Sequence, residues 1–237
     1  MRGENRFPMS DPTAIDRIHG GLIVSCQAAN DSPLSERRMI AALVQCAEIG
    51  GAAGVRVEGE QNIAFVRDIT ALPIIGIEKV ERAGTRLITP HLEAVPRLTQ
   101  AGADIVAIEL THRAYPAIDA YARALQQVDP IRTQVGVPLM ADISTAEEAA
   151  AAHEAGCDLV ATTLAGYTSY SRTDRLPDTR LVSELLEMGL TVVAEGGYQD
   201  PGQVRQIVQN GAWSVCVGTA ITDPIAITRR FVEALEH

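Results

Sequence analysis

The sequence has few positive charges and no long apolar run. Its 30 acidic residues outnumber its 20 basic ones, which gives a net charge of −10. This balance argues against a nucleic-acid partner, because binding to a phosphate backbone depends on clustered lysine and arginine. No segment approaches the roughly 20 apolar residues that span a bilayer, and the opening MRGENRFPMSDP lacks the apolar centre of a signal peptide. We therefore expect a cytoplasmic protein that binds neither nucleic acid nor a membrane.

Cysteine and histidine occur without the spacing of a metal site or a disulfide framework. The four cysteines, Cys26, Cys46, Cys157 and Cys216, include no CxxC pair, which fits a reducing compartment. The HxH and HExxH patterns that hold catalytic metals are also missing, and the five histidines are scattered along the chain. A metal-dependent reaction is therefore not expected.

Lysine is almost absent, because only Lys79 among the 20 basic residues is a lysine. A bias towards arginine explains the other basic residues but not this exception. Arginine stays protonated in proteins, whereas a desolvated lysine amine can lose its proton and act as a base. Lys79 is therefore a candidate for a position where arginine cannot serve, with an incidental lysine as the alternative.

One phrase recurs along the chain: a helical stretch, a glycine, an apolar run of four or five residues, and then a polar residue. Examples are TQAGADIVAIEL, HEAGCDLVATTL and LEMGLTVVAEGG. The glycine suits a helix C-cap, and the continuous apolar run suits a strand buried on both faces of a parallel sheet. The eight predicted strands lie near residues 21–26, 53–57, 73–77, 105–109, 138–142, 159–162, 191–195 and 214–217.

This alternation of strands and helices predicts an α/β fold, a single-domain (β/α)8 TIM barrel. A doubly wound open sheet is the alternative. The barrel is expected over residues 20–237, preceded over residues 1–19 by an arm and a short helix, TAIDRIH. No linker or second domain is evident in the sequence.

In such a barrel the active face lies at the C-terminal ends of the strands, so the polar residue that closes each apolar run is informative. A polar residue could follow each apolar run simply because the buried strand ends there, and this alternative would explain several of these residues taken one at a time. Long, desolvated side chains at several strand ends are instead typical of residues that converge on a ligand. In chain order these residues are Gln27, Arg56, Lys79, Glu109, Asp142, Thr162 with Thr163, Glu195, and Gly218 with Thr219.

Glu195 closes the apolar run TVVAE. A buried carboxylate must be neutralised by a partner or poised for chemistry, because an unpaired buried charge is costly. If Glu195 faces Lys79 across the barrel mouth, one group can take a proton and the other can give one. Such a pair suits removal of a proton α to a carbonyl and its return.

Glycines follow the seventh and eighth predicted strands. Gly196, Gly197 and Gly218, with Thr219, offer backbone N–H groups where such barrels commonly bind phosphate. Glycine pairs also serve simply as tight turns. Their position favours a phosphate site.

Several motifs resemble one family along nearly the whole chain, from Gly20 to about Phe231. They are GGLIVSCQA, RVEG, PIIGIEK, MADIST, ATTLAGYTSY, VAEGG and VGTAIT, in this order. The sequence is similar to the N-acylglucosamine-6-phosphate 2-epimerases, also called N-acetylmannosamine-6-phosphate 2-epimerases. The resemblance implies a (β/α)8 barrel that interconverts N-acetylmannosamine 6-phosphate and N-acetylglucosamine 6-phosphate in sialic acid breakdown, without a metal, nucleotide or other cofactor.

The resemblance also implies roles at the matching positions. Lys79 matches the catalytic lysine of GI-x-K and would remove the C2 proton of the open-chain sugar to give an enediolate-like intermediate. Glu195 matches the catalytic glutamate of AEGG and would supply or manage the returning proton. The full expected set is Lys79 and Glu195 as catalytic residues; Gln27, Arg56, Glu109, Asp142, Thr163 and Tyr167 as substrate contacts; and Gly196, Gly197, Gly218 and Thr219 as phosphate contacts.

Three residues depart from the family pattern and bear on the substrate. Asp223 stands where the family usually has an arginine close to the phosphate, and its charge would oppose a phosphate dianion. Glu109 replaces a usual aspartate, which moves a carboxylate by about an ångström, and Glu78 replaces a usual apolar residue. Arg172 or Arg175 could replace the missing arginine, or both could be surface residues.

Three alternatives to this epimerase remain open. The first keeps the chemistry on an unphosphorylated or differently charged amino sugar. The second is a related phosphate-binding barrel synthase or lyase that forms a Schiff base on its lysine, which borohydride would trap. The third is a sugar-phosphate binding protein without activity. In each case the expected partner is a small molecule, and a homo-oligomer, in particular a dimer, is expected for such a barrel.

Overall fold

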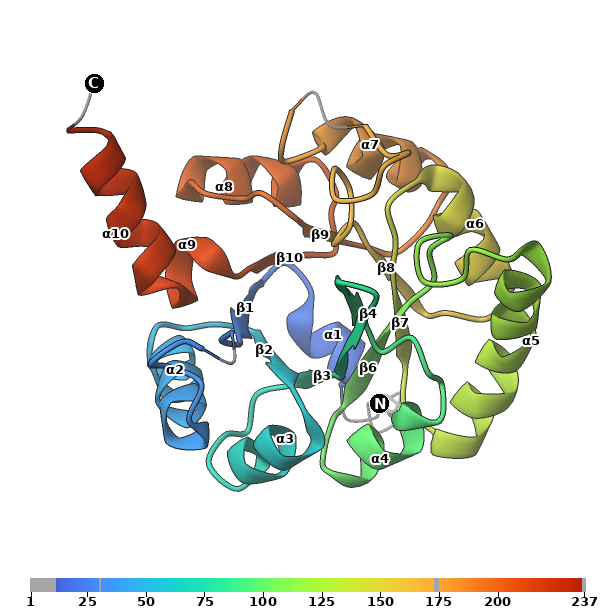
Figure 1. Ribbon diagram of the computed structural model, residues 1–237, viewed down its shortest axis with the longest axis horizontal. Helices are drawn as coiled ribbons and strands as arrows, with labels where there is room; N and C mark the ends of the chain where they lie inside the picture. The colour runs from blue at the N-terminus through green and yellow to red at the C-terminus, as the bar shows by residue number, and fades with distance from the viewer. Residues whose placement is uncertain (1–11, 30, 173–174, 236–237) are drawn as a thin grey trace, which may run out of the picture.

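The computed structural model describes residues 12–29, 31–172 and 175–235. Eight parallel strands close into a barrel in the order β1-β10-β9-β8-β7-β6-β3-β2 (Figure 1). Closure confirms the predicted (β/α)8 barrel and rules out the open doubly wound sheet. The barrel strands are β1 (Leu22–Cys26), β2 (Gly54–Glu58), β3 (Ile74–Ile77), β6 (Ile105–Glu109), β7 (Leu139–Asp142), β8 (Leu159–Ala161), β9 (Val192–Glu195) and β10 (Ser214–Val217).

Helices form the outer ring, as Figure 1 shows. Within the described residues, no helix is long and apolar enough to cross a membrane. The helices that follow the barrel strands are α2 (Arg37–Ile49), α3 (Glu60–Arg67), α4 (Ala94–Gln100), α5 (Ile118–Val135), α6 (Ala146–Glu154), α7 (Thr179–Glu187), α8 (Pro201–Gln209), α9 (Thr219–Thr222) and α10 (Pro224–Glu233).

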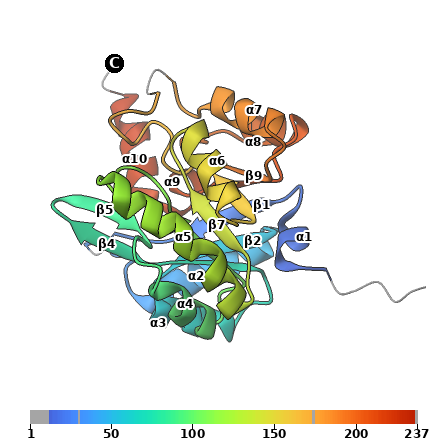
Figure 2. The ribbon, with the colours of Figure 1, turned by 90° about the vertical axis from the view of Figure 1, so that its right-hand side faces the viewer.

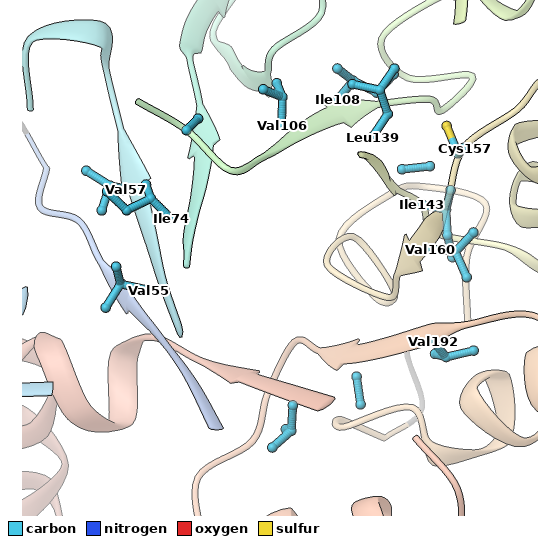
Figure 3. Close-up of a cluster of buried hydrophobic side chains, with 14 of the residues drawn as sticks. Val55, Val57, Ile74, Val106, Ile108, Leu139, Ile143, Cys157, Val160 and Val192 are labelled. Atoms are coloured by element: carbon cyan, nitrogen blue, oxygen red, sulfur yellow. The ribbon is translucent and has the colours of Figure 1, made fainter. Parts of the chain in front are cut away.

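The apolar strands are buried on both faces, which explains their continuous rather than alternating hydrophobicity. One cluster fills the barrel interior and includes Ile75, Met140 and Val193. A larger cluster lies between the strands and the helices, and Figure 3 shows part of it, with Val55 and Val192 among the labelled side chains. Two buried layers of this kind hold the strand ends, and therefore the site, in fixed positions.

Helix α1 (Ala14–Ile18) lies within the stretch TAIDRIH where a short helix is predicted. Thr13 caps it, since its hydroxyl accepts the N–H of Asp16 while the Asp16 carboxylate accepts the N–H of Thr13. Ile18 is fully buried in the interior cluster, and Trp213 donates its indole N–H to the carbonyl of Ile15 at 2.9 Å. The helix therefore packs on the barrel interior. Residues 1–11 of the predicted arm lie outside the described residues.

A β-hairpin absent from the sequence prediction follows β3. Strands β4 (Lys79–Arg82) and β5 (Thr85–Ile88) pair antiparallel as a separate two-stranded sheet. The turn between them has positive φ at Ala83 (49°) and Gly84 (76°), the geometry of a tight hairpin turn. In Figure 2 the hairpin and α1 lie at opposite ends of the barrel. Lys79 is thus the first residue of the hairpin.

Candidate active site

A cleft opens at the C-terminal ends of the barrel strands. It has an inner lobe of about 600 Å³ and an outer lobe of about 440 Å³ that share Gln27, Lys79 and Gly218 among their walls. The predicted site residues that line the inner lobe are Gln27, Arg56, Lys79, Thr163, Tyr167, Glu195, Gly196, Gly197, Gly218 and Thr219. Strands and loops distant in sequence therefore bring ten of the twelve predicted residues to one cavity.

Arg56 connects two carboxylates inside the barrel. Its Nη2 donates to Asp142 Oδ2 at 2.6 Å, and its Nη1 donates to Asp142 Oδ1 at 3.0 Å and to Glu195 Oε2 at 2.7 Å. Arg56 is 1% exposed and Asp142 fully buried. Thr163 Oγ1 lies 2.5 Å from the Asp142 carboxylate and 3.1 Å from that of Glu195. The Asp142 side chain does not itself line the cleft, so its predicted contact with substrate stays a prediction.

Glu195 shares its counterion, because Arg56, 2.7 Å away, also forms a two-point pair with Asp142. Burial raises the pKa of Glu195 above its ordinary 4.5; Arg56 opposes this rise, and the Asp142 charge adds to it. Thr162 fixes the backbone here, since its hydroxyl donates to the Glu195 carbonyl and accepts the Glu195 N–H. The end of β9 therefore holds a carboxyl group whose pKa is raised by burial.

Lys79 has the opposite electrostatic shift. Burial lowers its pKa from the ordinary 10.5, and the charges of Arg56 and Arg86 lower it further, against the carboxylates of Glu58 and Glu195. A lysine with a lowered pKa is more available as a neutral base at working pH. One cleft thus contains a carboxyl group shifted towards its acid form and an amine shifted towards its base form.

The phosphate-contact glycines are conformationally required. Gly196 and Gly197 have φ of 96° and 79°, where other residues are strained. A Cβ on Gly197 would also lie 2.7 Å from the Cβ of Leu176. These observations explain the glycines by the turn alone, so phosphate binding there stays a prediction. Gln27 meanwhile donates to Ser25 Oγ at 2.7 Å, which orients its amide in the cleft.

Glu109 supports the hairpin and does not line the cleft. The side chain is fully buried and accepts the N–H of Ile88 in β5 at 2.8 Å. It also accepts from Arg113 at 2.9 and 3.1 Å and from the Thr111 hydroxyl at 2.8 Å. Arg113 in turn donates to the backbone carbonyl of Arg86 at 3.3 Å. The predicted contact of Glu109 with substrate therefore stays a prediction, whereas its contact with the hairpin is direct.

Two arginines of the cleft were missed in the sequence. Arg86 lines both lobes and Arg113 lines the inner one. Arg86 belongs to the unpredicted hairpin, and Arg113 lies four residues beyond the end of β6. No sequence pattern indicated Arg113, because the pairing of charges four residues apart is a rule for helices and Glu109 ends a strand.

The departures from the family pattern have local structural explanations. Asp223 caps α10, since its carboxylate accepts the N–H of Ala226 at 2.9 Å. It still lines the outer lobe. Arg172 donates to the Glu184 carboxylate at 2.9 and 2.7 Å, and Arg175 lines a different, smaller cavity between α7 and α8. Neither arginine lines the cleft.

No group of three His, Cys, Asp or Glu side chains arranged to hold a metal occurs among residues 12–29, 31–172 and 175–235.

Comparisons with known proteins agree on one family. The family model described as "Putative N-acetylmannosamine-6-phosphate epimerase" matches residues 40–237. A "Putative N-acetylmannosamine-6-phosphate 2-epimerase 1" from Salmonella typhimurium is 39% identical over 223 residues, covering 92% of this chain and 94% of the relative. A "Putative N-acetylmannosamine-6-phosphate 2-epimerase" from Caldanaerobacter subterraneus subsp. tengcongensis is 40% identical over 225 residues, covering 94% of each.

A solved structure is similar along almost its whole length. The N-acetylmannosamine-6-phosphate 2-epimerase from Clostridium perfringens superposes with a TM-score of 0.86 at 34% identity, covering 97% of this chain and 100% of that one. The fold, the sequence relatives and the family match coincide, and the chain belongs to the N-acetylmannosamine-6-phosphate epimerase family.

Proposed function

We propose that this protein interconverts N-acetylmannosamine 6-phosphate and N-acetylglucosamine 6-phosphate by removing and returning the C2 proton, with Lys79 as base and Glu195 as acid. The observation that carries the assignment of roles is the opposite pKa shift of these two groups in one cleft. Membership of the family supports the substrate pair.

The chemistry balances with these two groups. Neutral Lys79 takes the proton from C2 of the open-chain sugar, the C2–H electron pair becomes the C1–C2 double bond, and the carbonyl oxygen takes the negative charge. Protonated Glu195 then gives a proton to C2 from the other face, and the carbonyl re-forms. The carboxylate left on Glu195 lies 2.7 Å from an Arg56 nitrogen, which stabilises its new charge. Proton exchange with solvent restores both groups.

The test is proton NMR of N-acetylmannosamine 6-phosphate in D2O, with the wild-type protein and with Lys79→Met. Wild type should place deuterium at C2 and produce the gluco epimer, whereas Lys79→Met should lose roughly 10²- to 10⁴-fold in rate, the usual contribution of a positioned base. Glu81→Gln, in the same hairpin but half exposed, is the matched control and should retain exchange. Exchange that persists in Lys79→Met, or none in wild type, would contradict the proposal.

The same reaction on an unphosphorylated amino sugar is the second candidate. Asp31 and Asp223 both line the outer lobe, and carboxylates there oppose a dianion. The identical NMR experiment with N-acetylmannosamine separates the two substrates. Faster exchange of the unphosphorylated sugar would favour the second candidate.

We also propose a cytoplasmic homodimer, in which a second copy covers α10. This helix has no buried residue, and in Figure 1 it extends away from the barrel. Its exposed apolar side chains are Ile225, Phe231 and Val232, and Leu235 follows it. An exposed apolar patch of this kind is typical of a protein–protein contact, and a two-fold contact is the commonest solution for one chain.

A further inference from the structure

Four basic side chains line the cleft, Arg56, Lys79, Arg86 and Arg113. Two of them are held by fully buried carboxylates, Arg56 by Asp142 and Arg113 by Glu109. Neither can leave its partner for a ligand without stranding a buried charge. Lys79 acts as a base only without its charge. Arg86 is therefore the cleft cation for which exchanging its present partner for an anion costs the least free energy.

Among the described residues, the ion-pair partner of Arg86 is an exposed side chain. The Nε of Arg86 donates to Glu81 Oε1 at 2.6 Å, and the two side chains are 47% and 58% exposed. Pairs exposed to this degree contribute little, because solvent screens them and solvates either partner alone. A phosphate dianion, which matches the planar guanidinium in two-point geometry, can displace Glu81.

The position of Arg86 fits a ligand that is bound near the strand-end glycines. Arg86 borders both lobes, as do Gly218 and Thr219. The carboxylates of Asp31 and Asp223 line only the outer lobe, while Gly196 and Gly197 line only the inner one. Of the side chains that the structure describes, one carboxyl group, that of Glu195, lines the inner lobe, and two line the outer lobe. An anion therefore meets less repulsion on the inner side of Arg86, where backbone N–H groups can also bind it.

We propose that Arg86 is the specificity-determining cation of the cleft. It releases the Glu81 carboxylate and binds the 6-phosphate of the sugar instead. The inference rests on the proposed function for the identity of the sugar. In the hairpin register Lys79 is opposite Ile88 and Glu81 is opposite Arg86, so Lys79 and Arg86 share one face. A phosphate bound to Arg86 thereby fixes the reacting carbon relative to the base on the same hairpin.

The first experiment compares N-acetylmannosamine 6-phosphate with N-acetylmannosamine in wild type, Arg86→Gln and Arg86→Lys. Arg86→Gln should raise KM for the phosphorylated sugar roughly 10- to 100-fold, as expected for a lost hydrogen bond to a charged group. The loss of kcat/KM should be larger for the phosphorylated sugar than for the unphosphorylated one, which has no phosphate for Arg86 to bind. A change in kcat that both sugars share would reflect the loss of the Arg86 charge that acts on Lys79. Arg86→Lys should recover part of the affinity, and Glu81→Gln should keep or lower KM because it removes the competing carboxylate.

A direct binding measurement separates this inference from the proposed function. Inorganic phosphate, titrated by calorimetry, should bind wild type and Glu81→Gln and should lose at least tenfold in affinity with Arg86→Gln. Phosphate binding that depends on Arg86 in a protein without C2 exchange would refute the proposed reaction and support the anion site. Equal phosphate affinity in Arg86→Gln, or an equal loss of kcat/KM with both sugars, would overturn the role of Arg86.

Discussion

The backbone N–H of Ile88 donates to the carboxylate of Glu109 at 2.8 Å, and this bond ties the hairpin of Lys79 to the barrel wall. Ile88 is also the cross-strand partner of Lys79. Lys79 is therefore linked through its cross-strand neighbour Ile88 to the fully buried carboxylate of Glu109 in β6. Arg113 strengthens the link because it contacts both Glu109 and the backbone of Arg86.

Glu109→Gln should lower kcat with less effect on KM. The amide keeps the shape of the side chain but turns one acceptor into a donor that faces the Ile88 or Arg113 N–H groups. A shift of the hairpin by about an ångström can cost roughly 100-fold in rate. Steady-state kinetics on folded protein, verified by circular dichroism, measure the effect. An unchanged kcat would show that Glu109 does not position Lys79.

Arg56→Met should destabilise the protein by roughly 3–5 kcal/mol, because it leaves a buried carboxylate without its partner. The carboxylate left unpaired is that of Asp142, since both of its oxygens accept from Arg56. Urea denaturation measures the free energy of unfolding. The double variant Arg56→Met with Asp142→Leu removes both charges and should recover part of the loss. Equal stability of the single and double variants would argue against an energetically important pair.

The pH dependence of kcat/KM should be bell-shaped. Lys79 acts only when neutral, so its protonation limits the rate at low pH, and burial lowers its pKa from the ordinary 10.5. Glu195 acts only when protonated, so its ionisation limits the rate at high pH, and burial raises its pKa from the ordinary 4.5. Both limbs are thereby moved towards neutral pH.

Glu195→Gln separates the two limbs. This variant removes the requirement for a protonated carboxyl group, so its residual rate should rise with pH to a plateau and show no decline. The limb that remains belongs to Lys79. A bell that survives in Glu195→Gln would mean that another group supplies the proton.

The strands could be predicted because each is a continuous apolar run after a helix-ending glycine, and the observed bounds differ from the predicted ones by a residue at most at either end. The hairpin could not, because KVER and TRLI carry charges on short strands and pair only with each other. The site followed from polar residues in or after apolar runs. Glu195 closes β9, whereas Arg56 lies in the middle of β2 and donates to Glu195 inside the barrel. Glu109 also closes a strand, but its carboxylate accepts hydrogen bonds from Ile88 and Arg113. The sequence pattern does not distinguish a strand-end carboxylate that binds the protein itself from one that binds a ligand.

Phe231→Glu should convert the proposed dimer to a monomer. Phe231 is 73% exposed on α10, and a carboxylate at a contact between two copies would have to be buried without a partner. Sedimentation should give twice the chain mass of 25.3 kDa for wild type and a single chain mass for the variant. Glu233→Gln, a polar exposed position on the same helix, is the control and should remain dimeric. Because Lys79 and Glu195 lie on β4 and β9 rather than on α10, the monomeric variant should retain C2 exchange, and a wild type that sediments as a single chain would refute the dimer.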